Sequence, residues 1–147
     1  MADGNQKPLV QSGLLLTEAA GLHLLEVAVA KAEELGIKAT VAVVDPSGRL
    51  LAFVKMAGSF LVSSELARKK AVTAAGMGMD TVELETVLNA EPPRVLSGLT
   101  RSENFTVIGG GVPLVRDNHI VGGIGVSGGS EEQDIECAQA AARLICT

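Results

Sequence analysis

Aromatic residues and positive charge are what this chain lacks most. Of its 147 residues only 2% are aromatic, all of them phenylalanine, and the formal net charge is −5. Proteins that hold single-stranded nucleic acids stack the bases on aromatic side chains and bind the phosphates with clustered lysine and arginine. The composition therefore argues against a nucleic-acid partner, and it leaves the core to be filled by aliphatic side chains.

Cysteine is also scarce, with only Cys137 and Cys146 present. They lie nine residues apart on one expected helix, which is too far along the helix axis for a disulfide between them. The chain contains no Cys-x-x-Cys motif and no zinc-ligand spacing. We interpret both cysteines as small packing residues in a reducing compartment.

Long apolar runs are missing as well. No stretch is long enough to span a bilayer, and the opening residues MADGNQKPLVQSG lack the basic and apolar regions of a signal peptide. We therefore expect a cytoplasmic protein with no membrane partner.

The remaining composition, with 47% hydrophobic and 20% charged residues, is typical of one globular domain. We expect a single domain over 17–147, preceded by a flexible segment over 1–16. Apolar residues at helical spacing predict helices over 17–35, 65–75, 81–88 and 130–145. Thr17 is a suitable N-cap and Gly36 a suitable stop for the first helix. Ser63 or Ser64 can cap the second.

The last predicted helix opens with a capping box, formed by Ser130 and Gln133. Strand patterns cover 39–44, 50–54 and 105–108, and a second hairpin covers 112–126. Turn residues stand between the paired runs, at 45–48 and at Asp117 and Asn118. Pro113 cannot donate to a ladder, so its strand is expected at an edge of the sheet or to begin there. Residues 94–103 are expected as loop with a helical turn. The fold class is α+β, with an antiparallel five-stranded sheet flanked by helices.

Glycine is concentrated in the stretch 109–129, which holds eight of the 17 glycines. Such density indicates close approach of another group to the backbone. Two explanations remain open: a helix packed tightly on the sheet, or a bound ligand. Gly123, Gly125 and Gly128 match the spacing GxGxxG, but the antiparallel context and the missing second βαβ strand argue against dinucleotide binding.

Groups for acid and base chemistry are few: Asp45, Glu65, Lys70, His23 and His119. By helical angle, His23 groups with glutamates on a polar face, and His119 belongs to a turn that meets solvent. Lys70 lies beside an apolar stripe, so it either extends its ammonium to solvent or meets an anion; the pattern favours the first. The helix start at Ser130 could receive an anion, although the glutamates that follow it already complement the dipole.

Three segments carry a family likeness: VAVVDPSGRLLAFVKMAGS, SSELARKKAVTAA and GGGVPLVRDNHIVGGIGVSGG, followed by EEQD. Their order and content resemble the GlcG/HbpS-like haem-binding family, which includes the C-terminal domains of PduO-type proteins. The resemblance covers about 17–145. It implies an α+β domain with a profilin-like arrangement that assembles into homo-oligomers, and a small-molecule ligand, haem or a related tetrapyrrole.

The resemblance also implies residue roles. His23 is the candidate axial ligand of the haem iron, with Lys70 or Arg68 meeting a propionate. The implied cofactor-binding residues are His23, Met56, Lys70, Gly110, Gly111 and Gly123. The alternative is a cofactor-independent enzyme, a lyase, hydratase or isomerase acting on a small organic acid or carbonyl compound. In that case Lys70 anchors the substrate and Glu65 or Asp45 serves as the base.

Overall fold

The computed structural model describes residue 4 and residues 6–147. The expected flexible segment 1–16 lies partly outside these residues, and its described part from 6 to 16 contains neither helix nor strand. The elements in chain order are α1 Glu18–Leu35, β1 Thr40–Val44, β2 Leu50–Lys55, α2 Leu61–Met77, α3 Thr81–Leu88, α4 Pro93–Thr100, β3 Gly111–Arg116, β4 His119–Ser127 and α5 Glu131–Ala142.

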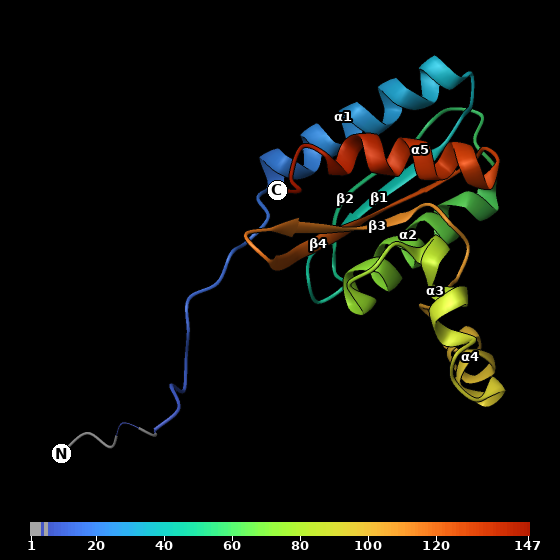
Figure 1. Cartoon of the computed structure of the whole chain (residues 1–147). Coiled ribbons are helices and arrows are strands. Elements are labelled where there is room, and N and C mark those ends of the chain that lie inside the picture. The colour runs from blue at the N-terminus through green and yellow to red at the C-terminus, as the bar shows by residue number, and fades with distance from the viewer. Residues whose placement is uncertain (1–3, 5) are drawn as a thin grey trace.

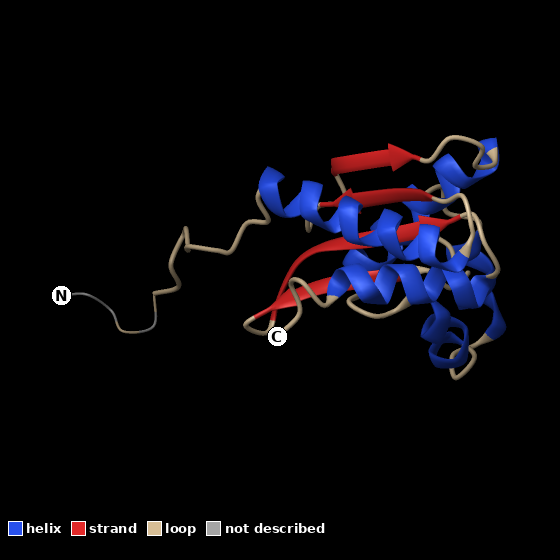
Figure 2. Ribbon diagram, turned by 90° about the horizontal axis from the view of Figure 1, so that it is seen from above, coloured by secondary structure: helices blue, strands red, loops and turns tan. Residues whose placement is uncertain are grey.

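The molecule has three layers (Figure 1). Helices α1 and α5 lie side by side over one face of the sheet, and α2 covers the other face. Figure 2, seen from above, shows α1 and α5 in front of the sheet, running roughly along the strands. Helices α3 and α4 project beyond the sheet on the side of α2. None of the helices in the described residues is long and apolar enough to cross a membrane.

The sheet is antiparallel and has four strands in the order β2-β1-β4-β3. Strand β3, which contains Pro113, is an edge strand, as the missing N–H of proline predicts. Strands β3 and β4 turn at Asp117 and Asn118, which have φ of 52° and 61°. Positive φ at both central residues is the signature of the tight hairpin turn for which Asp and Asn were predicted.

The two faces of the sheet carry side chains of different size. Toward α1 and α5 the strands present large aliphatic residues, which form the main core: Val41, Val43, Val112, Leu114, Val121, Ile124 and Val126. Toward α2 they present Ala42 and Val44 together with glycines. Helix α2 packs against them with Ala67, Ala71 and Ala75, which are spaced four residues apart on one face of the helix. Small residues on both sides allow helix and sheet backbones to approach closely.

Helix boundaries agree with the capping signals at both ends of the chain. The Thr17 hydroxyl accepts from the amide of Ala20, and Gly36 ends α1 with φ of 74°. Ser130 and Gln133 form the predicted capping box of α5. Cys137 lies in the core, Cys146 is exposed, and both are free thiols. Burial, reinforced by nearby carboxylates, raises the pKa of Cys137 to about 11.

The prediction of a five-stranded sheet is wrong, because residues 105–108 form no strand. Their backbone bonds go to threonine side chains instead of a neighbouring strand. The amide of Thr106 donates to Thr73 Oγ1 at 3.1 Å, and the carbonyl of Ile108 accepts from Thr81 Oγ1 at 2.7 Å. Periodicity in sequence cannot reveal such side-chain pairing.

Three helix predictions also differ from the structure. Helix α5 ends at Ala142 and not at 145, so Cys146 lies beyond the helix that carries Cys137. Helix α2 starts at Leu61 after an N-cap at Phe60 that has no side-chain bond, so Ser63 and Ser64 lie inside the helix. Residues 94–103 were expected as loop with a helical turn, but Pro93–Thr100 form the helix α4, with a proline in its first turn. Proline fits that position because the first helical N–H groups have no partner within the helix.

Candidate functional site

His23 lies on the exposed side of α1, where it lines an open depression of about 250 Å³ with Ala19, Ala20, Leu144 and Ile145. We call this the His23 depression. Helical side chains point back toward the N-terminus of the helix, over the residues three and four positions earlier. For His23 those residues are Ala19 and Ala20, so the imidazole lies beside a small apolar patch on α1.

A second depression, of about 200 Å³, adjoins the first, and we call it the Arg116 depression. Both are lined by Ala20 and Ile145. The other lining residues of the second are Leu14, Leu15, Leu16, Thr17, Arg116 and Val121. The two together form one mainly aliphatic surface where α1 begins, next to the turn of the β3–β4 hairpin and the end of the chain.

His119 lies in the hairpin turn, where it lines a third depression of about 360 Å³ with Ser12, Gly13, Leu14 and Asp117. Its Nδ1 donates to the carbonyl of Asp117 at 2.7 Å. The residue is exposed, as the turn position predicts.

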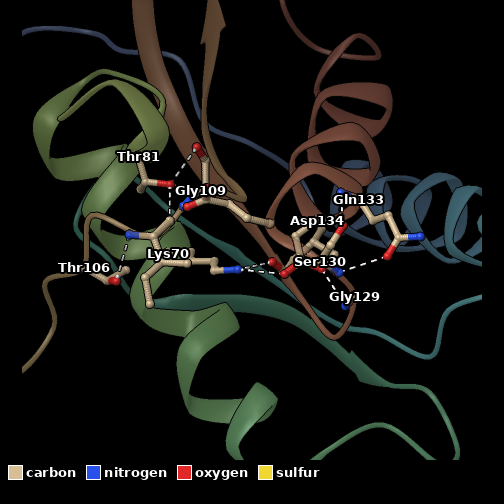
Figure 3. A network of polar contacts seen from close by, with 12 residues as sticks. Lys70, Thr81, Thr106, Gly109, Gly129, Ser130, Gln133 and Asp134 are labelled. Carbon is tan, nitrogen blue, oxygen red and sulfur yellow. Dashed lines mark hydrogen bonds and ion pairs between the residues drawn. The ribbon is translucent and has the colours of Figure 1, made fainter. Parts of the chain in front are cut away.

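Lys70 is completely buried in α2 (Figure 3). Its Nζ donates to the carbonyl of Val126 at 2.8 Å and to Asp134 Oδ2 at 3.0 Å. Burial lowers the pKa of Lys70 below its ordinary value, while the Asp134 carboxylate opposes that shift. The interpretation that favoured an ammonium extended to solvent is wrong, since the anion that Lys70 meets is a carboxylate of α5, on the other side of the sheet.

Backbone amides of the protein's own loops already bond the carboxylates at the start of α5. Asp134 Oδ1 accepts from the amide of Gly129 at 2.8 Å, and Glu131 Oε2 accepts from the amide of Gly109 at 2.8 Å. Figure 3 shows Asp134, Gly129 and the Lys70 side chain close together. This cluster fixes the glycine-rich loops on both sides of the ion pair.

The candidate glycines Gly110, Gly111 and Gly123 face protein atoms at close range. A Cβ at Gly110 would lie 2.9 Å from Lys70 Nζ and 2.6 Å from the carbonyl oxygen of Val126. At Gly111 and Gly123 it would collide with the carbonyl oxygens of Lys70 and Ala71. Of the two explanations left open for these glycines, the structure shows tight packing of a helix on the sheet.

The other candidates are dispersed. Met56 belongs to the core, where its Sδ accepts from the amide of Ala39 at 3.3 Å. Asp45 Oδ1 accepts from the amides of Ser47 and Arg49 and so organises its own turn. Glu65 is exposed on α2 with its carboxylate 3.8 Å from Arg68, whose Nη2 also donates to Asn104 Oδ1 at 2.8 Å.

Sequence reasoning missed two residues. Asp134 lies 64 positions from Lys70, and the two meet only because α2 and α5, on opposite faces of the sheet, place them at the same end of it. Arg116 bonds the backbone of the last residues after α5. No local pattern marks either contact. Among the described residues, no three His, Cys, Asp or Glu side chains gather in a way that could hold a metal ion.

Residues 16–143 match the family described as haem degrading protein HbpS-like. The chain belongs to this family. The resemblance inferred from three sequence segments is thereby confirmed.

Known relatives agree with the HbpS-like assignment. Corrinoid adenosyltransferase PduO of Salmonella typhimurium is 42% identical over 127 residues, which make up 84% of this chain but 37% of that protein. The crystal structure of a PduOC:heme complex is 37% identical with a TM-score of 0.82, covering 90% of this chain and 96% of that one. The crystal structure of HbpS is 29% identical with a TM-score of 0.85, covering 100% and 99%.

Proposed function

We propose that this HbpS-like protein binds haem or a related tetrapyrrole at the His23 depression, with His23 as the axial ligand of the iron. The observation that carries the proposal is the position of His23, an exposed imidazole above Ala19 and Ala20 on an aliphatic surface. A neutral imidazole is a suitable ligand for haem iron. A relative 37% identical to the chain is known as a complex with haem.

The residues around His23 suit a large planar ligand. The helix surface beside the imidazole is built from Ala19 and Ala20, and Leu144 and Ile145 add apolar area. The adjoining Arg116 depression extends this surface along the segment before α1. Apolar contact with a macrocycle and one iron ligand would together hold the group, and the bound iron would supply the redox chemistry.

The alternative of a cofactor-independent enzyme receives less support from the geometry. Lys70 is buried in an ion pair, Asp45 is bonded into a turn, and Glu65 is exposed on α2. A general base must lie within hydrogen-bonding reach of its substrate and beside the groups that anchor it. These three side chains do not share a depression of that kind. Adenosyl transfer by the whole PduO protein is likewise not carried over, since the chain spans 37% of its length.

Titration of the purified protein with haemin tests the proposal. We expect a shifted Soret band that saturates, because an imidazole replaces water at the iron. His23→Ala should abolish this spectrum, whereas His119→Ala, a change of the other exposed histidine, should leave it unchanged. An absent Soret shift in the wild type, or the same spectrum in His23→Ala, would contradict the proposal.

A further inference from the structure

Arg116 stands at the boundary between the two depressions. Its Nε donates to the carbonyl of Ile145 at 2.7 Å, and its Nη2 is 3.4 Å from the carbonyl of Leu144. Leu144 and Ile145 both line the His23 depression, and Arg116 itself lines the neighbouring one. The guanidinium group therefore lies at the rim of the surface that His23 faces.

The charge of this guanidinium is not neutralised. Among the residues that the structure describes, Arg116 forms no ion pair, since its two partners are neutral backbone carbonyls. A guanidinium carries five N–H donors, so several remain for another acceptor. The two backbone bonds also hold the group in position, which lowers the entropy cost of forming a further bond. Arg116 is thus a preorganised cation beside an apolar surface.

The cations first expected to meet a propionate are engaged elsewhere. Lys70 Nζ is buried against Asp134. Arg68 belongs to α2, which covers the opposite face of the sheet from α1, and it bonds Asn104 and Glu65 there. Neither lines the His23 depression or the Arg116 depression.

We propose that Arg116 binds a carboxylate of the ligand held at His23, and so selects tetrapyrroles with free acid side chains. This inference rests on the proposed function, since it concerns the same surface. The chemistry is the charge-assisted, two-pronged bond that a guanidinium makes with a carboxylate. The aliphatic surface contacts the body of the macrocycle, and the guanidinium at its rim donates to the carboxylate that reaches toward solvent.

A comparison of two ligands isolates this contact. Haemin carries two free propionates, and haemin dimethyl ester has the same ring and iron with both acids masked as neutral esters. Each is titrated into the wild type, Arg116→Leu and Arg143→Leu, with the Soret band as readout. Arg143 is the matched control, an exposed arginine just after α5 that lines neither depression.

We expect Arg116→Leu to weaken the binding of haemin about fivefold, the upper range for an exposed ion pair, and to leave the ester unchanged. Arg143→Leu should change neither affinity. High salt should narrow the preference of the wild type for the free acid, because exposed charges are screened. Circular dichroism checks that each variant is folded. If Arg116→Leu is unfolded, Arg116→Gln is used in its place, because the glutamine side-chain amide can still donate to the Ile145 carbonyl.

The outcomes separate this inference from the function on which it rests. If neither ligand gives a Soret shift with the wild type, the proposed function fails and Arg116 has no ligand to select. If haemin binds through His23 but Arg116→Leu retains the preference for the free acid, only the role of Arg116 is overturned. An equal loss of affinity for haemin and ester also overturns it, since a structural effect on the end of the chain would not distinguish the two.

Discussion

At the scale of single residues, the pair formed by Lys70 and Asp134 is the clearest determinant of stability. Both side chains are buried, with Nζ and Oδ2 3.0 Å apart. Their charges are held by further bonds, to the Val126 carbonyl on one side and the Gly129 amide on the other. A buried charge that loses its partner is strongly unfavourable, whereas a matched neutral pair is tolerated. The ion pair therefore acts as one unit.

Replacing one member of the pair should cost more than replacing both. We expect Lys70→Met to lower the free energy of unfolding by about 3–5 kcal/mol, since Asp134 is left buried and unpaired. The double variant Lys70→Met with Asp134→Asn should recover part of that loss, because the asparagine oxygen can still accept from Gly129. Urea unfolding of the two single variants and the double variant measures the coupling. Additive losses would contradict a coupled pair.

Sequence reasoning at this scale was limited by the distance between partners. The helical angle placed His23 on the exposed face of its helix, because that face is a local property of 18–35. Local periodicity could not predict that Lys70 pairs with Asp134, or that Arg116 bonds the carbonyls of Leu144 and Ile145. These contacts depend on how separate elements are arranged in the fold. The residue that closes an ion pair or borders a depression is a tertiary property.

At the scale of elements, the contact of α2 with the glycine-rich strands decides the architecture. A Cβ at Gly125 would collide with the carbonyl of Ala67 and lie 2.6 Å from the amide of Ala71. Those atoms are helix backbone, which cannot rotate away as a side chain can. Gly111, Gly123 and Gly125 are therefore required by the close approach of α2 rather than by turn geometry.

Two glycine-to-alanine substitutions should have opposite effects. We expect Gly125→Ala to destabilise the protein by about 3 kcal/mol or more, because α2 must move away from the sheet. Gly76→Ala, near the end of α2, should stabilise it by about 0.5–1 kcal/mol, since nothing lies within 4 Å of the new methyl group and alanine favours a helix. Thermal and urea unfolding compare the two. A Gly125→Ala protein as stable as the wild type would show that the contact is not tight.

Elements whose ends are marked by capping or turn residues nearby in the sequence were predictable. Segments whose backbone is bonded by side chains from other elements were not. The caps at Thr17 and Ser130 and the turn at Asp117 and Asn118 each depend on residues within four positions. The segment 105–108 has strand-like composition, yet threonines of other elements take its backbone bonds. Helix α2 starts at a residue with no capping side chain, so its first turn left no signal to read.

At the scale of the whole molecule, an apolar patch remains open at the start of α2. Phe60, Leu61 and Val62 are 70%, 85% and 71% exposed, and they are consecutive. Glu65, Arg68 and Lys69 border the broad depression that contains Leu61 and Val62. Single exposed apolar residues are ordinary on protein surfaces, but a contiguous patch rimmed by charges is typical of a contact with another protein. Family resemblance implies a homo-oligomer, and we expect this patch to contribute to it.

Disrupting the patch should therefore lower the native mass. Size-exclusion chromatography with light scattering should give the wild type a multiple of its chain mass of 15.1 kDa. Leu61→Glu should shift the population toward smaller species, because burying a charge in an apolar interface is unfavourable. We expect the affinity between the chains to fall at least about tenfold, as is typical when a central interface residue is lost. Leu9→Glu is the matched control, since Leu9 is 96% exposed but lies outside every helix and strand. A wild type of 15.1 kDa, or equal effects of both changes, would mean that the patch serves another purpose.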